Sequence, residues 1–166
     1  TNTRYLLYVD GATADDPVIW LSQIGEYKYT VSQSSYTADT WQHVFASAWP
    51  DSPCKLSIAL NGALMCATEL EAEAPTEDES YVQISGDNVF IPAIDGAIAE
   101  VAIYDVDLSA APARFELADG FAPSRVMPQN LIAYWPLVRG LQDVVGGHTL
   151  TAQNDPVVVE HPRVIA

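Results

Sequence analysis

Hydrophobic and polar residues alternate along most of the chain. Between residues 27 and 33, for example, Tyr27, Tyr29 and Val31 alternate with polar neighbours. A period of two indicates a strand with one buried face. The pattern predicts strands at Tyr5–Asp10, Val18–Ile24, Tyr27–Gln33, Trp41–Trp49, Lys55–Leu60, Ala63–Leu70, Tyr81–Ser85, Val89–Ile91, Ala97–Asp105, Leu131–Leu137 and Val157–Val159.

Turn and helix signals separate these segments. Asn61-Gly62 is a strong signal for a two-residue hairpin, which would place Leu60 opposite Ala63 and Ser57 opposite Cys66. Ser109 is expected to cap one short helix, about residues 110–118, which Gly120 ends. Many short strands separated by glycine and proline predict an all-β sandwich or barrel, and 166 residues fit a single domain spanning 1–166.

The charge of the chain narrows the choice of partners. It has 7 basic and 22 acidic residues, a net charge of −15. Such a field repels phosphate backbones and anionic lipid surfaces, so we expect no nucleic acid and no membrane partner. No apolar run is long enough to span a bilayer, and the residues from Thr1 onward do not form a signal peptide.

The two cysteines flank the predicted hairpin. If its register extends in both directions, Cys54 lies opposite Glu69, while Cys66 lies opposite Ser57. Disulfide geometry does not allow a bond across that offset. We therefore expect free thiols.

Four segments stand out in the order of the chain. They are Trp41-Gln42-His43-Val44; Leu56 to Asn61-Gly62; Asp95-Gly96 to Tyr104-Asp105 with Leu108-Ser109; and the tail made of residues 120–124, residues 130–137 and His161-Pro162-Arg163. Together they resemble the laminin-G-like branch of the concanavalin A-like superfamily, in a bacterial and phage-associated form.

The resemblance implies an antiparallel jelly-roll β-sandwich with one short helix. It also implies that Trp41 anchors the core between the sheets and that Glu100 bonds the backbone or a neighbouring strand. The strand region that family members carry before the segment matching Tyr5 is absent or very short here. An uncovered sheet edge would permit an oligomer.

Catalysis finds little support in the residues. His43, His148 and His161 lack a second ligand at zinc spacing, and His43 is interpreted as a satisfied histidine of the sheet. Because the superfamily includes glycoside hydrolases, we also considered the alternating Glu69, Glu71 and Glu73. They run into an acidic loop without the aromatic walls of a sugar cleft, so we predict that the chain is not an enzyme.

Two kinds of binding site remain as hypotheses. Laminin-G-like domains often hold one calcium ion, and loop oxygens suit this ion. The candidate ligands are Asp10, Asp15, Asp16, Asp87, Asn88 and Asp95. For carbohydrate, Trp49 and Tyr36 are the candidates, because aromatic rings stack on the apolar faces of sugars.

The first hypothesis is therefore a lectin-like recognition or adhesion module at an extracellular or virion surface, which binds a glycan or a glycosylated surface. The alternative is a structural virion component, a capsid decoration or fibre protein that docks on a shell protein. A glycoside hydrolase is the second alternative. The first two overlap, since a virion lectin domain satisfies both.

Overall fold

The computed structural model describes residues 3–9, 18–24, 27–33, 36–49, 51, 55–67, 84, 96–110, 112–138, 140–153 and 155–165. Its contacts divide the chain into two compact units, Thr1–Ile94 and Asp95–Ala166. Each unit is considered separately below. The expectation of a single domain over residues 1–166 stays a prediction.

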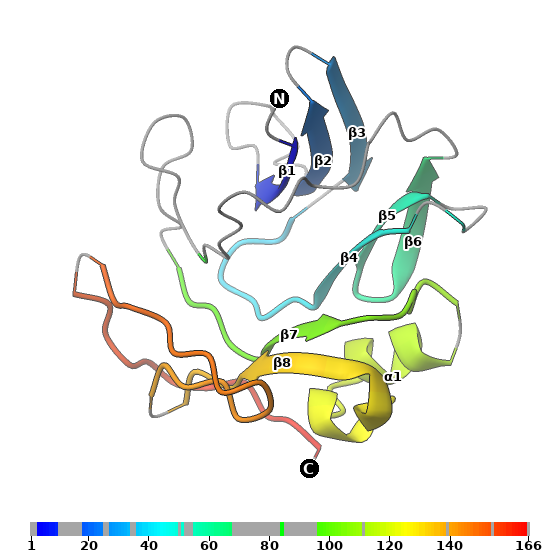
Figure 1. The fold of residues 1–166 in the computed structure, drawn as a ribbon. Helices are drawn as coiled ribbons and strands as arrows, with labels where there is room; N and C mark the ends of the chain where they lie inside the picture. The colour runs from blue at the N-terminus through cyan, green and yellow to red at the C-terminus, as the bar shows by residue number, and fades with distance from the viewer. Residues whose placement is uncertain are drawn as a thin grey trace. The chain divides into compact units, whose positions relative to one another are not determined.

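The first unit contains two three-stranded antiparallel sheets, both in sequential strand order (Figure 1). One sheet holds β1 (Thr3–Val9), β2 (Val18–Ile24) and β3 (Tyr27–Gln33); the other holds β4 (Val44–Ala48), β5 (Leu56–Leu60) and β6 (Ala63–Ala67). Strand β5 contacts β2 and β3, and β6 contacts β3, so the two sheets pack on each other. The predicted all-β, antiparallel sandwich with very little helix is confirmed.

The core of this unit lies between the two sheets. Leu56, Ile58 and Leu60 project from one side of β5 and pack with Val18 of β2. Val44 and Ala48 of β4 pack against the same cluster. The core residues of β5 occupy every second position, and those of β4 share one face of their strand, as the alternating pattern of the sequence predicts. This spacing places the apolar face of each strand in the core.

The hairpin between β5 and β6 has the predicted register. Leu60 pairs with Ala63, and Ser57 pairs with Cys66. Asn61 and Gly62 have φ values of 48° and 83°, the positive angles that a type I′ turn requires.

The expectation of free thiols is wrong. Cys66 is disulfide-bonded, and the sequence holds one other cysteine, Cys54, which lies outside the described residues. The physical reason is that the ladder does not extend as assumed. Strand β5 begins at Leu56, so the register of the hairpin does not determine the position of residue 54.

The second unit is built on an antiparallel pair, β7 (Val101–Tyr104) and β8 (Leu131–Trp135) (Figure 1). The chain between them forms α1 (Ala113–Ala118) and two short 3-10 helices, η1 (Pro123–Arg125) and η2 (Pro128–Asn130). The C-terminal residues return to this segment. The Ile165 NH donates to the Gly120 carbonyl at 2.7 Å, and the Ala122 NH donates to the Ile165 carbonyl at 3.0 Å.

Helix α1 begins later than expected. It starts at Ala113 with Pro112 at the N-cap, and no side chain caps it. Ser109 instead bonds the Asp107 carboxylate through its NH and its hydroxyl, at 2.9 and 2.8 Å, so its side chain is not available to the helix. The predicted end is confirmed, since Gly120 takes a φ of 89° directly after the helix.

Of the strands predicted in the second unit, two differ from the structure in their extent and one is wrong. Strand β7 begins at Val101 because Glu100 has a left-handed φ of 56°, and β8 stops at Trp135, two residues before Leu137 with a φ of 61°. Val157–Val159 is not a strand: its backbone is unpaired within the described part of the second unit, and Val157 is 81% exposed. Three valines favour an extended backbone, but a strand also needs a neighbour to pair with. The strands predicted at Tyr81–Ser85 and Val89–Ile91 lie outside the described residues, apart from Ile84.

Candidate functional site

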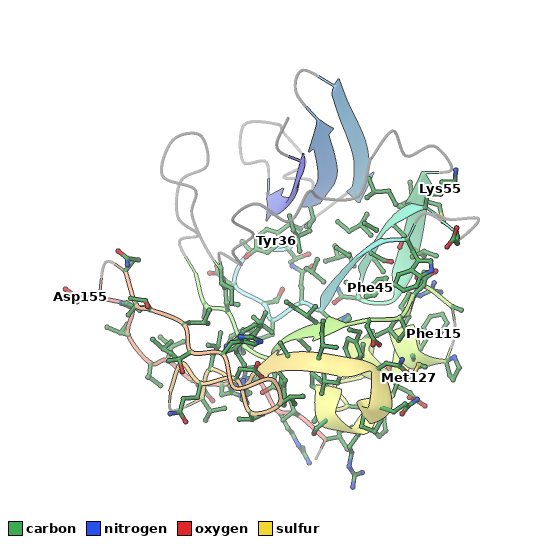
Figure 2. All side chains as sticks on the ribbon, in the orientation of Figure 1. Tyr36, Phe45, Lys55, Phe115, Met127 and Asp155 are labelled. Atoms are coloured by element: carbon green, nitrogen blue, oxygen red, sulfur yellow. The ribbon has the colours of Figure 1, made fainter. Side chains whose placement is uncertain are left out.

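The residues that lead into β4 form a turn with two exposed aromatic side chains, which we call the Tyr36–Trp41 turn. The Tyr36 side chain is 38% exposed and that of Trp41 is 46% exposed. Figure 2 shows Tyr36 on this stretch of chain. The prediction that Trp41 anchors the core is therefore wrong. Strand β4 starts at Val44, so Trp41 precedes the paired region and the pleat of the sheet does not direct its side chain inward.

Hydrogen bonds within the turn hold its backbone in place. The Thr37 carbonyl accepts from the Thr40 hydroxyl at 3.0 Å and from the Gln42 amide at 2.7 Å. Asp39 has a φ of 59°, which reverses the chain between the two rings. The turn thus presents two aromatic rings together with hydroxyl, carboxylate and amide groups.

The hairpin fixes the end of this turn. The His43 NH donates to the Asn61 side-chain oxygen at 2.9 Å, and the Asn61 NH donates to the His43 carbonyl at 2.9 Å. Asn61 therefore forms the type I′ turn and also anchors the residues just before β4. The two motifs that the sequence shows at Trp41–Val44 and Asn61-Gly62 are parts of one local structure.

His43, which follows the Tyr36–Trp41 turn, carries a neutral imidazole. Burial lowers its pKa, which keeps the imidazole neutral. Its Nδ1 atom is buried and has no hydrogen-bond partner within the described part of the chain, so the expectation of a satisfied histidine is wrong for this atom. His43 also lies one residue before β4, so the expectation that it belongs to the sheet is wrong; its backbone instead bonds to Asn61.

Trp49, the other predicted sugar-binding residue, follows β4 and is half-buried. Its backbone NH donates to the Lys55 carbonyl at 2.7 Å, and this bond closes the connection between β4 and β5. Less of its ring faces solvent than in Tyr36 or Trp41. Its role in binding stays a prediction.

The predicted calcium ligands cannot be placed. Asp10, Asp15, Asp16, Asp87, Asn88 and Asp95 all lie outside the described residues, as do Glu69, Glu71 and Glu73. Among the residues that the structure does describe, no group of three or more His, Cys, Asp or Glu could hold a metal ion.

The second unit contains a polar cluster around Glu100. Its carboxylate accepts a hydrogen bond from the Tyr134 hydroxyl and lies 2.9 Å from Nε2 of His161. Burial, followed by the hydrogen bond and charge of Glu100, raises the pKa of Tyr134, so the phenol stays protonated. The prediction that Glu100 bonds the backbone or a neighbouring strand is confirmed by Tyr134 of β8, and its second partner, His161, comes from the C-terminal segment. Because each oxygen of the Glu100 carboxylate has a partner, Glu100 links the backbone just before β7 to β8 and to the C-terminal segment.

A buried carboxylate, that of Asp143, organises the loop after β8. Its oxygens accept from the NH groups of Tyr134, Val145, Gly146 and His148, at 2.8, 2.9, 3.0 and 3.4 Å. A Cβ at Gly146 would lie 2.7 Å from the Asp143 Oδ2 atom and 2.7 Å from the Ile132 carbonyl, so only glycine fits there. Burial opposes the charge of Asp143, but the four NH groups outweigh it and lower the pKa to about 2.

This carboxylate should make the second unit acid-sensitive. Because the pKa of an unfolded aspartate is about 3.9, the stabilisation is complete above that pH and is lost as the pH falls toward 2. Asp143→Asn is expected to lower the melting temperature at neutral pH and to flatten its decline between about pH 4 and 2. Thermal unfolding followed by circular dichroism measures both effects. Asp155→Asn, which removes an exposed carboxylate of the same unit, is the control; equal profiles for the two variants would contradict the assignment.

Comparison with known protein families gives a match over residues 1–112. A laminin G family model, described as the concanavalin A-like lectin/glucanases superfamily, matches residues 1–112. The match covers the first unit and continues into the second as far as Pro112. Neither the curated proteins nor the solved structures give a match. Among the described residues, no helix is both long and apolar enough to cross a membrane.

Proposed function

Because the chain belongs to the concanavalin A-like lectin/glucanases superfamily, we propose that it is a non-catalytic recognition or adhesion module that binds carbohydrate at the Tyr36–Trp41 turn. The observation that carries this proposal is the exposure of two aromatic rings on one hydrogen-bonded turn. Aromatic faces pack on the C–H faces of sugars, and a few fixed polar groups select the hydroxyls. Thr37, Asp39 and Thr40 supply exposed polar side chains in the same turn.

An extracellular or surface location accords with this function. Cys66 is disulfide-bonded, and disulfides form and persist in oxidising surroundings. The net charge of −15 supports solubility in such a setting and opposes binding to phosphate-rich partners.

Calcium is a further part of the proposal. The six residues predicted from the sequence carry the hard oxygen ligands that this ion prefers. Glycan binding measured with calcium and with a chelator tests the idea, and equal binding in the two conditions would rule out a role for the ion.

The test of the sugar site is a glycan array probed with the whole chain and with three variants. Trp41→Ala and Tyr36→Ala should each weaken binding to the best glycan by about tenfold or more, equal to about 1.4 kcal/mol. Trp49→Ala tests the other predicted ring. The matched control is Phe115→Ala, which removes an aromatic side chain of α1 that is similarly exposed. No binding to any glycan, or equal losses for Trp41→Ala and Phe115→Ala, would contradict the proposal.

A second function, docking on a shell protein of a virion or surface assembly, has one observation in its favour. Val157, Val158 and Val159 form an exposed apolar run, and such runs mark contacts between proteins. Native mass measurement of the assembly that contains the chain would support this function by a fixed copy number. A lone monomer would count against it.

A further inference from the structure

A shallow cavity of about 310 Å³ lies in the second unit, between the end of α1 and η1. Glu116, Phe121, Arg125 and Val126 line it. Gly120, with its positive φ, reverses the chain after the helix, and the Phe121 NH then donates to the Glu116 carbonyl at 3.0 Å. This reversal brings side chains from the helix and from η1 to the same cavity.

Two side chains of opposite charge, Glu116 and Arg125, line the cavity and do not form an ion pair with each other. Glu116 and Arg125 are both exposed, and within the described part of the chain neither side chain has an ion-pair or hydrogen-bond partner. An unpaired guanidinium is notable in a chain with 22 acidic and only 7 basic residues. Both charged groups are therefore available to a ligand.

The remaining lining is apolar. Val126 is fully buried and Phe121 is half-buried, so Phe121 provides most of the apolar surface at the cavity, while both charged groups are exposed. The volume is at the lower end of the range of about 300–1,000 Å³ found for small-molecule sites. A ligand of a few heavy atoms with one apolar branch fits this space.

We propose that this cavity binds a small zwitterion, namely an α-amino acid with an apolar side chain. The ligand carboxylate pairs with the Arg125 guanidinium, whose fork matches two carboxylate oxygens, and the ammonium group pairs with the Glu116 carboxylate. The apolar side chain of the ligand lies on Phe121.

The charge of the whole chain favours a zwitterion over a simple anion. A net charge of −15 repels an anionic ligand, whereas a zwitterion carries no net charge. A simple cation would pair with Glu116 but would also face Arg125. Only a ligand with both charges satisfies both side chains.

The proposal goes beyond carbohydrate recognition and is independent of it. All four lining residues lie outside residues 1–112, which the family model matches, and outside the Tyr36–Trp41 turn. Loss of one activity therefore need not affect the other.

The experiment is a titration of the whole, isotopically labelled chain with L-leucine, followed through its backbone amide signals in ¹H–¹⁵N NMR spectra. Leucine at millimolar concentrations should shift the signals of the four lining residues. L-leucinamide lacks the carboxylate and N-acetyl-L-leucine lacks the ammonium group, so each should bind at least about tenfold more weakly. Equal affinity for leucine and both analogues, or no shift at these four residues, would overturn the proposal.

Two variants test separately what the charges of Arg125 and Glu116 contribute to leucine binding. Arg125→Gln should abolish the preference for leucine over leucinamide, and Glu116→Gln should abolish the preference over N-acetyl-leucine. Both side chains are exposed, so these variants are expected to fold. Lys55→Gln removes the same charge as Arg125→Gln from the first unit and should bind leucine like the unmodified chain. Undiminished leucine binding by Arg125→Gln would also overturn the proposal.

Discussion

Ile58→Ala is expected to lower the free energy of unfolding by about 2–5 kcal/mol. Ile58 has no exposed surface and lies at the centre of β5, where it packs in the core cluster with Val18. Truncation removes three buried carbon atoms and leaves a cavity that rigid strands on both sides cannot fill. Chemical denaturation followed by tryptophan fluorescence measures the loss.

The control for this prediction is Met65→Ala. Met65 is the cross-strand partner of Ile58 on β6, but its side chain is 46% exposed. Its truncation should cost less than about 1 kcal/mol, because most of the removed surface already contacts solvent. Similar losses for the two variants would show that β5 is not the centre of the core.

Cys66→Ser is expected to lower the free energy of unfolding by about 3 kcal/mol. Cys66 is disulfide-bonded, and a bridge to the chain's other cysteine closes a loop of about 13 residues around the hairpin, which restricts the unfolded chain. Thermal unfolding with and without a reductant measures this effect.

Reductant should lower the melting temperature of the unmodified chain to about that of Cys66→Ser and should leave the variant unchanged. Ala63→Ser, at an exposed position of the same strand, is the control for adding a serine to β6. If the variant melts with the unmodified chain and reductant has no effect, the bridge does not stabilise the fold.

The local features of the fold were predictable from the sequence because they depend on neighbours in the chain. The period of two located β2 and β3 at their observed bounds. Asn61-Gly62 predicted both the turn and the register of its hairpin, since a type I′ turn of two residues leaves one way to pair the strands.

Features that depend on distant segments were not predictable in the same way. Glu100 lies beside His161, which is 61 positions later in the sequence. The Asp143 carboxylate accepts hydrogen bonds from NH groups of both β8 and its own loop. The spacing of such residues in the sequence does not predict that they are in contact. The exposed position of Val157–Val159 has the same cause, because propensity describes the segment and not its neighbours.

The candidate site was partly predictable. Tyr36 was identified because a tyrosine among polar residues is typical of an exposed ring, and its exposure agrees. Trp41 was assigned to the core because the resemblance to the family implies this role. Strand β4 begins only at Val44, so the pleat of the sheet does not direct the Trp41 side chain inward.

The measurement that tests the central claim most directly is an NMR titration of the labelled whole chain with the best glycan from the array. Binding at the Tyr36–Trp41 turn should shift the Trp41 indole NH and the backbone signals of residues 36–43, while the signals of α1 stay in place. Shifts confined to other parts of the chain, or none at saturating glycan, would contradict the account.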